Sequence, residues 1–344
     1  MQKKAHVAIV GYGVIGKRVA DAVSVQDDMQ LVGIADTSSS MRVRVASAKG
    51  YQVYSATKDA GVRMKASRVS LAGHLEDLLA KVDIVVDCTL KNIAKKNVEV
   101  YQNRGVKFIL HGGEPHALTG HSFVAESNYA SAIGKTATRI VSCNTTSIVR
   151  TLGALKKAGL LNKARGTLLR RATDPWESHA GGIMNTLVPE PTIPSHQGPD
   201  AKFVDPDLDV VTMAVKVPQT LAHLHYWNVE LAKPAKVSEV IEAFGSSTRI
   251  KLIRVDEGMI ALNSVKELMA DLNRTHDSLY EVALWEDLVK IEGTELFYAY
   301  MVDNQAIVIP ETIDAIRALT HLSSDATASI RKTNKSLGIG ASFL

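Results

Sequence analysis

The stretch HVAIVGYGVIGKRVADAV, residues 6–23, decides the fold of the N-terminal half of the chain. It begins with His6–Val10, a short apolar run typical of a buried strand, passes through GYGVIG and continues with helical periodicity. A GxGxxG motif between a strand and a helix is the fingerprint of a Rossmann unit, in which the glycines permit a tight turn and close approach of a pyrophosphate. The stretch therefore predicts a dinucleotide site formed by Gly11, Gly13, Val14, Ile15 and Gly16.

The residue that follows the second apolar strand bears on the choice of cofactor. That strand, residues 30–35, ends in Asp36. A carboxylate at this position accepts hydrogen bonds from the adenosine ribose and repels a 2′-phosphate, so the sequence predicts that NAD is preferred to NADP. Because Ser38–Ser40 and Arg42 can turn toward a phosphate, we also expect detectable use of NADP.

Two further apolar runs predict parallel strands whose ends face the cofactor. Val82–Asp87 leads to Thr89, which is expected near the adenosine half, and Val106–Leu110 leads to Gly113, expected near the nicotinamide half. Cys88 is interpreted as a buried structural thiol.

A second cysteine, Cys143, stands in SCNTTS directly before an apolar-periodic run over residues 148–161. Since Ser, Asn and Thr favour helix starts, the sequence places this thiol at a helix N-terminus. Partial positive charge and free N–H groups gather there, which lowers the pKa of a thiol and can hold an oxyanion. We expect Cys143 to be a nucleophile with a lowered pKa.

The second half of the chain is dominated by strand patterns. Because strands that follow one another without long helices favour an antiparallel sheet, we expect a mostly antiparallel sheet here. The segments with strand character are residues 166–173, 208–217, 221–231, 249–255 and 288–302. Helical patterns near 236–244 and 263–272 would cover one face, and the Pro- and Gly-rich passage 174–206 is long enough to predict a functional loop.

These patterns predict an α/β fold in three segments. A Rossmann dinucleotide-binding domain occupies residues 1–142, and an α+β catalytic domain with a mostly antiparallel sheet occupies residues 143–303. Residues 304–344 carry two helical patterns that are expected to return to the dinucleotide-binding domain.

Composition narrows the class of protein. With 344 residues, 46% hydrophobic and 22% charged, the chain is an ordinary globular protein, and its mild net charge of +4 suits anionic metabolites rather than nucleic acid. No apolar run approaches the ~18 residues of a membrane span, and no signal peptide precedes the first strand. Two cysteines without metal-ligand spacing indicate no disulfide framework, no metal and a cytoplasmic location.

Two polar groups in the second half are candidates for chemistry. His223 and His225 share one face of a predicted strand, and either is a candidate general base for the Cys143 thiol. Arg170 and Arg171, together with His196, are candidates for binding a phosphate.

Several of these segments together resemble the archaeal-type (type II) phosphorylating glyceraldehyde-3-phosphate dehydrogenases. The matching segments are residues 11–22, 142–146, 170–175, 194–200, 213–218, 223–225, 310–317 and 330–338, in register over essentially the whole chain. The resemblance implies a homotetramer that oxidises D-glyceraldehyde 3-phosphate with inorganic phosphate to 1,3-bisphosphoglycerate, with hydride transfer to NAD(P). It also implies that Cys143 is the nucleophile and His223 the base.

The same resemblance implies further contacts. The residues it places at the substrate or its phosphate are Ser142, Asn144, His196 and Gln197, and we expect Thr145 and Arg170 to contribute to the phosphate site. Those it places at the cofactor or an anion are Gly113, Arg171 and Asn304.

The chain departs from the family pattern at four positions. It has Gln197 where the family has a second histidine, His111 where the family has glutamine, and Asp36 where many members carry a basic residue. It has Asn304 where the family has glutamine, and Gln305 is a rival for the nicotinamide contact.

The sequence is also compatible with three other functions. Aspartate-semialdehyde dehydrogenases and N-acetyl-glutamyl-phosphate reductases use the same Cys and His chemistry on acidic aldehydes, and a dinucleotide-binding sensor would need no chemistry at all. Kinetics with the different aldehydes and a test of thiol reactivity separate these functions.

Overall fold

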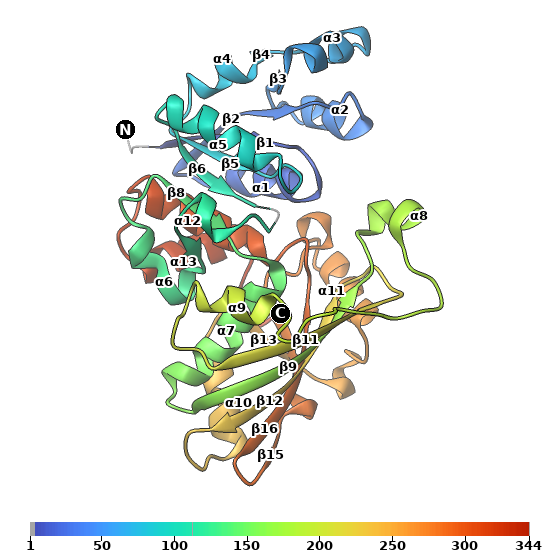
Figure 1. Ribbon diagram of the computed structural model, residues 1–344, viewed down its shortest axis with the longest axis vertical. Coiled ribbons are helices and arrows are strands. Elements are labelled where there is room, and N and C mark those ends of the chain that lie inside the picture. Colours follow the sequence, from blue (N-terminus) through green and yellow to red (C-terminus); the bar gives the residue numbers. More distant parts are fainter. Residues whose placement is uncertain (1–3, 112, 344) are drawn as a thin grey trace. The chain divides into compact units, whose positions relative to one another are not determined.

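The computed structural model describes residues 4–111 and 113–343, which form two compact units (Figure 1). The first unit runs to Val141 and includes Ile309–Leu337, and the second comprises Ser142–Val308 and the described residues from Gly338 on. The α/β class predicted from the sequence, with a Rossmann-like parallel sheet and a second, mostly antiparallel sheet, is confirmed.

The division of the chain differs slightly from the predicted boundaries, for local reasons. Residues 304–308 stay with the second unit, where Arg150 donates to the carbonyl oxygen of Ile307 at 3.2 Å. The residues after Gly338 also return to it, because the Lys251 ammonium donates to the carbonyl oxygens of Gly340 and Ala341.

The first unit is built on an eight-stranded sheet in the order β4-β3-β2-β1-β5-β6-β8-β7, and each of its pairings is parallel. The strands are β1 (Ala5–Val10), β2 (Met29–Asp36), β3 (Val53–Ser55), β4 (Gly73–His74), β5 (Ile84–Asp87), β6 (Lys107–Leu110), β7 (Ser122–Phe123) and β8 (Ala137–Ile140). The helices are α1 (Val14–Ser24), α2 (Met41–Ala48), α3 (Lys58–Ala66), α4 (Leu75–Leu79), α5 (Ala94–Asn103), α6 (Ala125–Ala132), α12 (Val308–Leu319) and α13 (Ala326–Leu337), with a 3₁₀ turn at His116–Leu118.

A buried arginine attaches the C-terminal helices to this sheet. Arg317 of α12 is 1% exposed and forms an ion pair with Asp28, which directly precedes β2, at 2.9 Å. Its other nitrogens donate to Gln26 at 2.6 Å and to Thr333 of α13 at 2.5 Å. Because a buried guanidinium without partners is costly, these bonds fix α12 and α13 in the first unit.

The second unit is built on a sheet in the order β10-β11-β9-β12-β16-β14-β13, and β15 pairs with β16. Five of the seven pairings are antiparallel, and β9–β11 and β13–β14 are parallel. The strands are β9 (Leu161–Arg171), β10 (Val188–Pro189), β11 (Val210–Val217), β12 (His223–Leu231), β13 (Ile250–Ile253), β14 (Val282–Trp285), β15 (Lys290–Glu292) and β16 (Glu295–Val302).

Two details of this sheet differ from the sequence prediction. Residues 288–302 were predicted as one strand but form a hairpin, which turns at Gly293 with φ +62°. The sequence prediction missed β14, a fully buried strand of four residues, because a short apolar run carries little periodicity.

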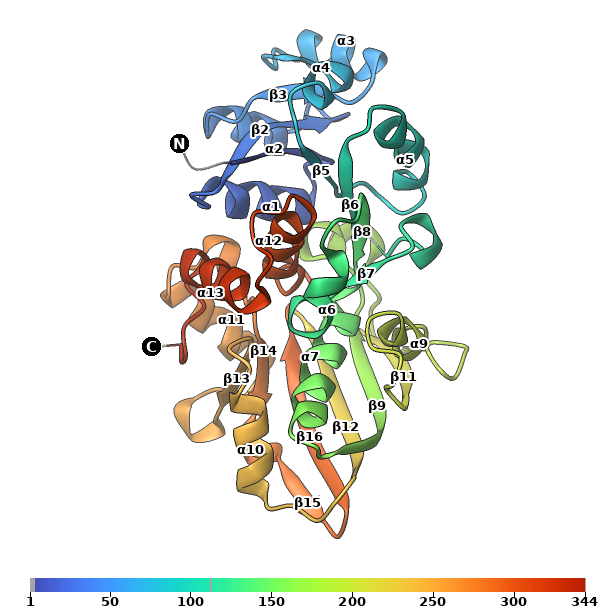
Figure 2. The ribbon, with the colours of Figure 1, turned by 90° about the vertical axis from the view of Figure 1, so that its left-hand side faces the viewer.

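Helices cover one face of the second sheet, and Figure 2 shows α7 and α10 lying over its strands. The helices of this unit are α7 (Cys143–Lys157), α8 (Ser178–Gly181), α9 (Gln197–Lys202), α10 (Val237–Gly245) and α11 (Leu262–Asp271). Short 3₁₀ turns occur at Pro175–Glu177, Val255–Glu257, Thr275–Asp277 and Glu286–Leu288. Across the described residues, every helix is too short or too polar to cross a membrane.

Candidate active site

The glycine motif of the first unit forms a cradle at the N-terminus of α1. Gly11 has φ +86°, which a residue with a side chain adopts only with strain. A Cβ on Gly16 would lie 1.9 Å from the carbonyl oxygen of Gly11, whereas a Cβ on Gly13 would meet nothing within 4 Å. The backbone N–H groups of Val14 and Ile15 lie in the first helical turn. This open space beside a helix N-terminus fits the pyrophosphate of a dinucleotide.

The carboxylate at the end of β2 is held by backbone groups. One oxygen of Asp36 accepts the N–H of Tyr12 at 2.7 Å, and the other accepts the N–H of Ser38 at 2.7 Å. These bonds fix a negative charge beside the glycine cradle, where the ribose of a dinucleotide is expected. Ser40 lies nearby with a buried hydroxyl oxygen that has no hydrogen-bond partner.

The ends of β5 and β6 hold the other predicted cofactor contacts. Thr89 donates to one carboxylate oxygen of Asp87 from both its N–H, at 2.9 Å, and its hydroxyl, at 2.5 Å. Burial raises the pKa of the Cys88 thiol, which agrees with a structural role. Gly113 has φ +74° and open space at its Cβ position, while Gly112 lies outside the described residues.

In the second unit, the structure confirms the predicted helix start at Cys143. Cys143 is the first residue of α7, and the hydroxyl oxygen of Ser142 caps the helix by accepting the N–H of Thr145 at 3.2 Å. The predicted lowering of the thiol pKa is wrong for the protein without ligands, because burial raises the pKa of Cys143 to about 11. The charges of Arg171 and Arg170 and the N–H of Asn144 oppose this shift without cancelling it.

His223 lies at the start of β12 and is 5% exposed. Its Nδ1 accepts the backbone N–H of Arg171 at 3.0 Å, so a neutral imidazole carries its proton on Nε2. Burial lowers the pKa of His223 well below its usual value, and the charge of Arg171 lowers it further. The ring is therefore neutral at physiological pH, with Nε2 available for a ligand.

His225 is fully buried and has side-chain partners at both nitrogens. Its Nε2 lies 2.9 Å from Oδ1 of Asn144 in α7, and its Nδ1 lies 3.0 Å from the hydroxyl of Tyr300 in β16. These bonds also bring the first turn of α7 to the strand that carries His223. Of the two histidines, His223 is the one with a nitrogen left for proton transfer.

The two arginines at the end of β9 have different partners. Arg171 donates to Asp174 at 2.7 Å, while its Nε and Nη1 are buried without a partner. Gln305 donates to the same carboxylate oxygen at 2.7 Å, and Oδ1 of Asn304 is buried without a partner. Arg171 therefore presents two unpaired donors, which suits an anion.

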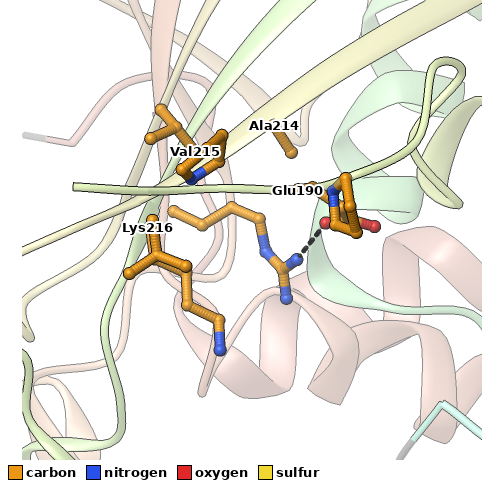
Figure 3. A pocket seen from close by; sticks show the side chains of 8 residues that line it. Glu190, Ala214, Val215 and Lys216 are labelled. Atoms are coloured by element: carbon orange, nitrogen blue, oxygen red, sulfur yellow. Dashed lines mark hydrogen bonds and ion pairs between the residues drawn. The ribbon is translucent and has the colours of Figure 1, made fainter.

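Arg170 and His196 meet at a carboxylate that the sequence prediction missed. Glu190 accepts from Arg170 at 2.7 Å and from His196 at 2.8 Å. Burial acts against ionisation, but the hydrogen bond from His196 and the charge of Arg170 hold the pKa of Glu190 below its usual value. Glu190 and Lys216 also line a pocket of about 390 Å³, shown in Figure 3. The only sequence signal for Glu190 was the length of the 174–206 loop.

Two other predicted phosphate contacts are buried. Gln197 is 0% exposed, and both polar atoms of its amide lack a hydrogen-bond partner. The hydroxyl of Thr145 donates to Asp200 of α9 at 3.1 Å, which joins this helix to α7. Gln197 thus keeps unused hydrogen-bonding capacity, whereas Thr145 is part of the packing of the helix start.

A cradle for a dinucleotide and a cysteine at a helix start near a buried histidine, in one chain, are features of dinucleotide-dependent dehydrogenases that use a cysteine nucleophile. Comparison with known families is more specific. Residues 142–291 match the family model described as the glyceraldehyde 3-phosphate dehydrogenase C-terminal domain, and residues 5–112 match the one described as the dihydrodipicolinate reductase N-terminus.

Similarity to individual proteins extends over nearly the whole chain. A glyceraldehyde-3-phosphate dehydrogenase of Methanobrevibacter smithii is 43% identical over 97% of this chain and 99% of its own length. Those of Methanococcoides burtonii and Thermococcus kodakarensis are 43% and 42% identical, each over 98% of this chain and 99% of their own length. The chain belongs to the glyceraldehyde-3-phosphate dehydrogenase family, and the resemblance to its archaeal type is confirmed.

Proposed function

We propose that the protein catalyses the reversible, phosphate-dependent oxidation of D-glyceraldehyde 3-phosphate to 1,3-bisphosphoglycerate, with NAD or NADP as the hydride acceptor. The observation that carries the proposal is the position of Cys143 at the first residue of α7, where its thiol feels the charges of Arg170 and Arg171. These groups provide a nucleophile and a site for an anionic substrate, which a sensor without chemistry would not need.

Cys143 is the proposed nucleophile. Its S–H bond breaks as the sulfur bonds to the aldehyde carbon, and the carbonyl π electrons move to oxygen, where N–H groups at the start of α7 stabilise the negative charge. That oxygen then takes up the thiol proton, which gives the hydroxyl of the thiohemiacetal. When bound, the nicotinamide ring supplies the acceptor for the hydride of that carbon. A phosphate oxygen then attacks the resulting thioester, the carbon–sulfur bond breaks, and the sulfur recovers its electron pair.

His223 is the proposed proton-transfer residue. In the resting tautomer Nε2 carries the proton and donates to the substrate oxygen. Accepting the hydroxyl proton requires the other neutral tautomer, which loses the hydrogen bond from Arg171 at a cost of about 1–3 kcal/mol. That cost is small beside the ~10²–10⁴-fold contribution of a general base. His223→Ala is expected to lower the maximal rate by that factor, and His225→Ala by less.

We propose that buried side-chain groups without hydrogen-bond partners bind the substrate and inorganic phosphate. Nε and Nη1 of Arg171 and the amide of Gln197 are buried and unpaired, so an anion there would satisfy them. Arg170 and His196 already share Glu190, and an anion would compete with that carboxylate. We place Ser142 and Thr145 beside these groups as the helix cap that orients Cys143.

NAD is the proposed preferred cofactor. The Asp36 carboxylate meets a 2′-phosphate as a like charge, which disfavours NADP by roughly 1–3 kcal/mol, or about one to two decades in affinity. The unpaired hydroxyl of Ser40 can donate to the 2′-phosphate and offset part of this free-energy cost, so detectable use of NADP is expected. Asp36→Lys should shift the ratio of kcat/KM values toward NADP. A wild-type enzyme that is more efficient with NADP would show that the serine loop controls the choice.

We also propose a cytoplasmic homotetramer. The face of the second sheet opposite α7 exposes Met213, Tyr226 and Leu288 at 44%, 48% and 42%, around a groove of about 500 Å³. An apolar face of this kind suits a second copy of the chain. Light scattering should therefore give four subunits, and Tyr226→Lys should reduce that number. The two free cysteines agree with a reducing compartment.

Initial rates test the reaction itself. NADH or NADPH formation from D-glyceraldehyde 3-phosphate should depend on inorganic phosphate and be faster with NAD than with NADP. Aspartate semialdehyde and N-acetylglutamate semialdehyde serve as the competing substrates. Higher kcat/KM with either semialdehyde would contradict the proposal and support the related acidic-aldehyde enzymes.

A further inference from the structure

Both ring nitrogens of the buried His225 form hydrogen bonds with side chains of other elements. It has no exposed surface, and its two nitrogens join three elements, β12, α7 and β16, through Asn144 and Tyr300. Its ring lies 4.9 Å from the ring of Tyr300, centroid to centroid. The partners are 81 and 75 residues away in the sequence, so the contact is a tertiary one that fixes the start of α7.

The acceptor on Asn144 determines where the proton of His225 lies. Since Oδ1 of Asn144 can only accept, Nε2 of His225 must donate, which leaves Nδ1 as an acceptor for the Tyr300 hydroxyl. At 3.0 Å, Nδ1 is a closer acceptor for that hydroxyl than Oγ of Ser147 at 3.3 Å. Burial lowers the pKa of His225 to about 3, and the charge of Arg170 acts in the same direction. The ring is thus a neutral donor throughout the physiological pH range and cannot serve as a base that titrates there.

The bond to Oδ1 leaves the other end of the Asn144 amide free. Asn144 is only 2% exposed, but its Nδ2 makes no hydrogen bond in the described residues and is not completely sealed from solvent. The backbone N–H of the same residue already bonds to the Cys143 sulfur. The backbone donor of Asn144 therefore lies at the reacting atom, and His225 holds the side-chain amide of the same residue by its oxygen, which leaves the Nδ2 end unbonded.

We propose that His225, supported by Tyr300, is a positioning residue that holds the Asn144 amide so that Nδ2 donates to the oxyanion formed at Cys143. This inference rests on the proposed function for the identity of the substrate. The oxyanion itself forms in any attack of the thiol on a carbonyl, which allows a test without cofactor and without glyceraldehyde 3-phosphate.

Two reactions of Cys143 separate oxyanion binding from thiol reactivity. With 4-nitrophenyl acetate the sulfur bonds to the acyl carbon, an oxyanion forms and collapses, the ester C–O bond breaks, 4-nitrophenolate leaves and the thiol proton goes to solvent. Iodoacetamide alkylates the same sulfur by displacing iodide, with no oxyanion. A group that binds the oxyanion affects the first rate and leaves the second unchanged.

His225→Leu should slow acylation about 10–100-fold and change alkylation by less than about threefold between pH 6 and 9. Asn144→Ala should slow acylation by ~10²–10³, as expected for removal of one oxyanion donor. The double variant should be no slower than Asn144→Ala, because His225 acts through that amide. His225→Gln, whose amide N–H can reach Oδ1, should recover most of the rate.

Tyr300→Phe keeps the ring volume and removes the donor to Nδ1, so it should give a smaller loss of acylation. Tyr298→Phe is the matched control, since Tyr298 lies on the same strand, two residues away, and its hydroxyl has no hydrogen bond to His225. Equal losses of acylation and alkylation, additive effects in the double variant, or unchanged acylation in His225→Leu would each overturn the proposal. Wild-type acylation without any oxidation of glyceraldehyde 3-phosphate would instead contradict the proposed function alone.

Discussion

The cofactor cradle of the first unit and the proposed catalytic cluster of the second are built on different principles. The cradle is mostly backbone: three glycines and a helix N-terminus, with one side-chain carboxylate held by two backbone N–H groups. The catalytic cluster consists of buried side chains whose partners are distant in sequence, as in the bond from His225 to Asn144. A backbone site follows from local sequence, whereas the properties of a side-chain cluster depend on how deeply the fold buries it.

The substitution Cys143→Ser tests whether turnover and NAD binding depend on different regions of the molecule. A serine hydroxyl is a far weaker nucleophile than a thiol, so turnover should fall by more than ~10⁴. The affinity for NAD, measured by calorimetry, should not change, because the cradle lies in the other unit. Substantial residual oxidation of the aldehyde would remove Cys143 from the mechanism.

The second test concerns the electrostatics of the catalytic cluster. Because burial raises the pKa of Cys143 to about 11, only a small fraction is thiolate at pH 7 in the enzyme without ligands. The rate of alkylation by iodoacetamide should therefore rise about tenfold per pH unit, or ~10³-fold from pH 7 to 10. A plateau below pH 8 would show that Cys143 and His223 form an ion pair instead.

The position and the thiol pKa of Cys143 show which properties of the site the sequence could predict and which it could not. Helix-start residues around Cys143 predicted its position, and the GYGVIG motif predicted the cradle, because both signals are local. The thiol pKa was predicted in the wrong direction because burial by the fold raises it, and the charge of Asp303, far along the chain, raises it further. Glu190 was missed for the same reason, since its partner Arg170 is 20 residues away.

The histidine pair gives a second example. Alternation along the strand correctly placed His223 and His225 on one face, but it left open which of them is free to act. Only the positions of Asn144 and Tyr300 show that both nitrogens of His225 are occupied. The hairpin at Gly293 was missed because a continuous apolar pattern does not mark where a strand turns.

A pair of glycine substitutions tests the cradle with no change to the catalytic cluster. At Gly13 an added Cβ enters open space, so Gly13→Ala should fold normally and weaken NAD binding about tenfold or more, because the pyrophosphate loses its close approach. At Gly16 a Cβ would lie 1.9 Å from the Gly11 oxygen, so Gly16→Ala should lower the free energy of unfolding by about 1–3 kcal/mol.

Acylation of Cys143 by 4-nitrophenyl acetate is the control for these glycine variants. Gly13→Ala should keep the wild-type acylation rate, since that reaction needs no cofactor. If Gly13→Ala bound NAD as tightly as the wild type, the space beside it would not be where the pyrophosphate lies.

The smallest expected effect concerns His111, a buried histidine in the first unit. Burial lowers the pKa of His111 to about 3, and its Nε2 lies 2.9 Å from the Thr312 hydroxyl of α12. The unfolded chain binds a proton near pH 6.5 and the folded chain does not, so this site loses stability as the pH falls below 6.5. The loss amounts to about 1.4 kcal/mol per pH unit.

His111→Gln tests this effect, because glutamine keeps a donor for Thr312 but cannot titrate. The urea midpoint of this variant should match that of the wild type at pH 7.5 and exceed it at pH 5.5. His179→Gln, at an exposed position, is the control and should behave as the wild type at both values. Equal acid sensitivity of His111→Gln and wild type would show that His111 is not held neutral by the fold.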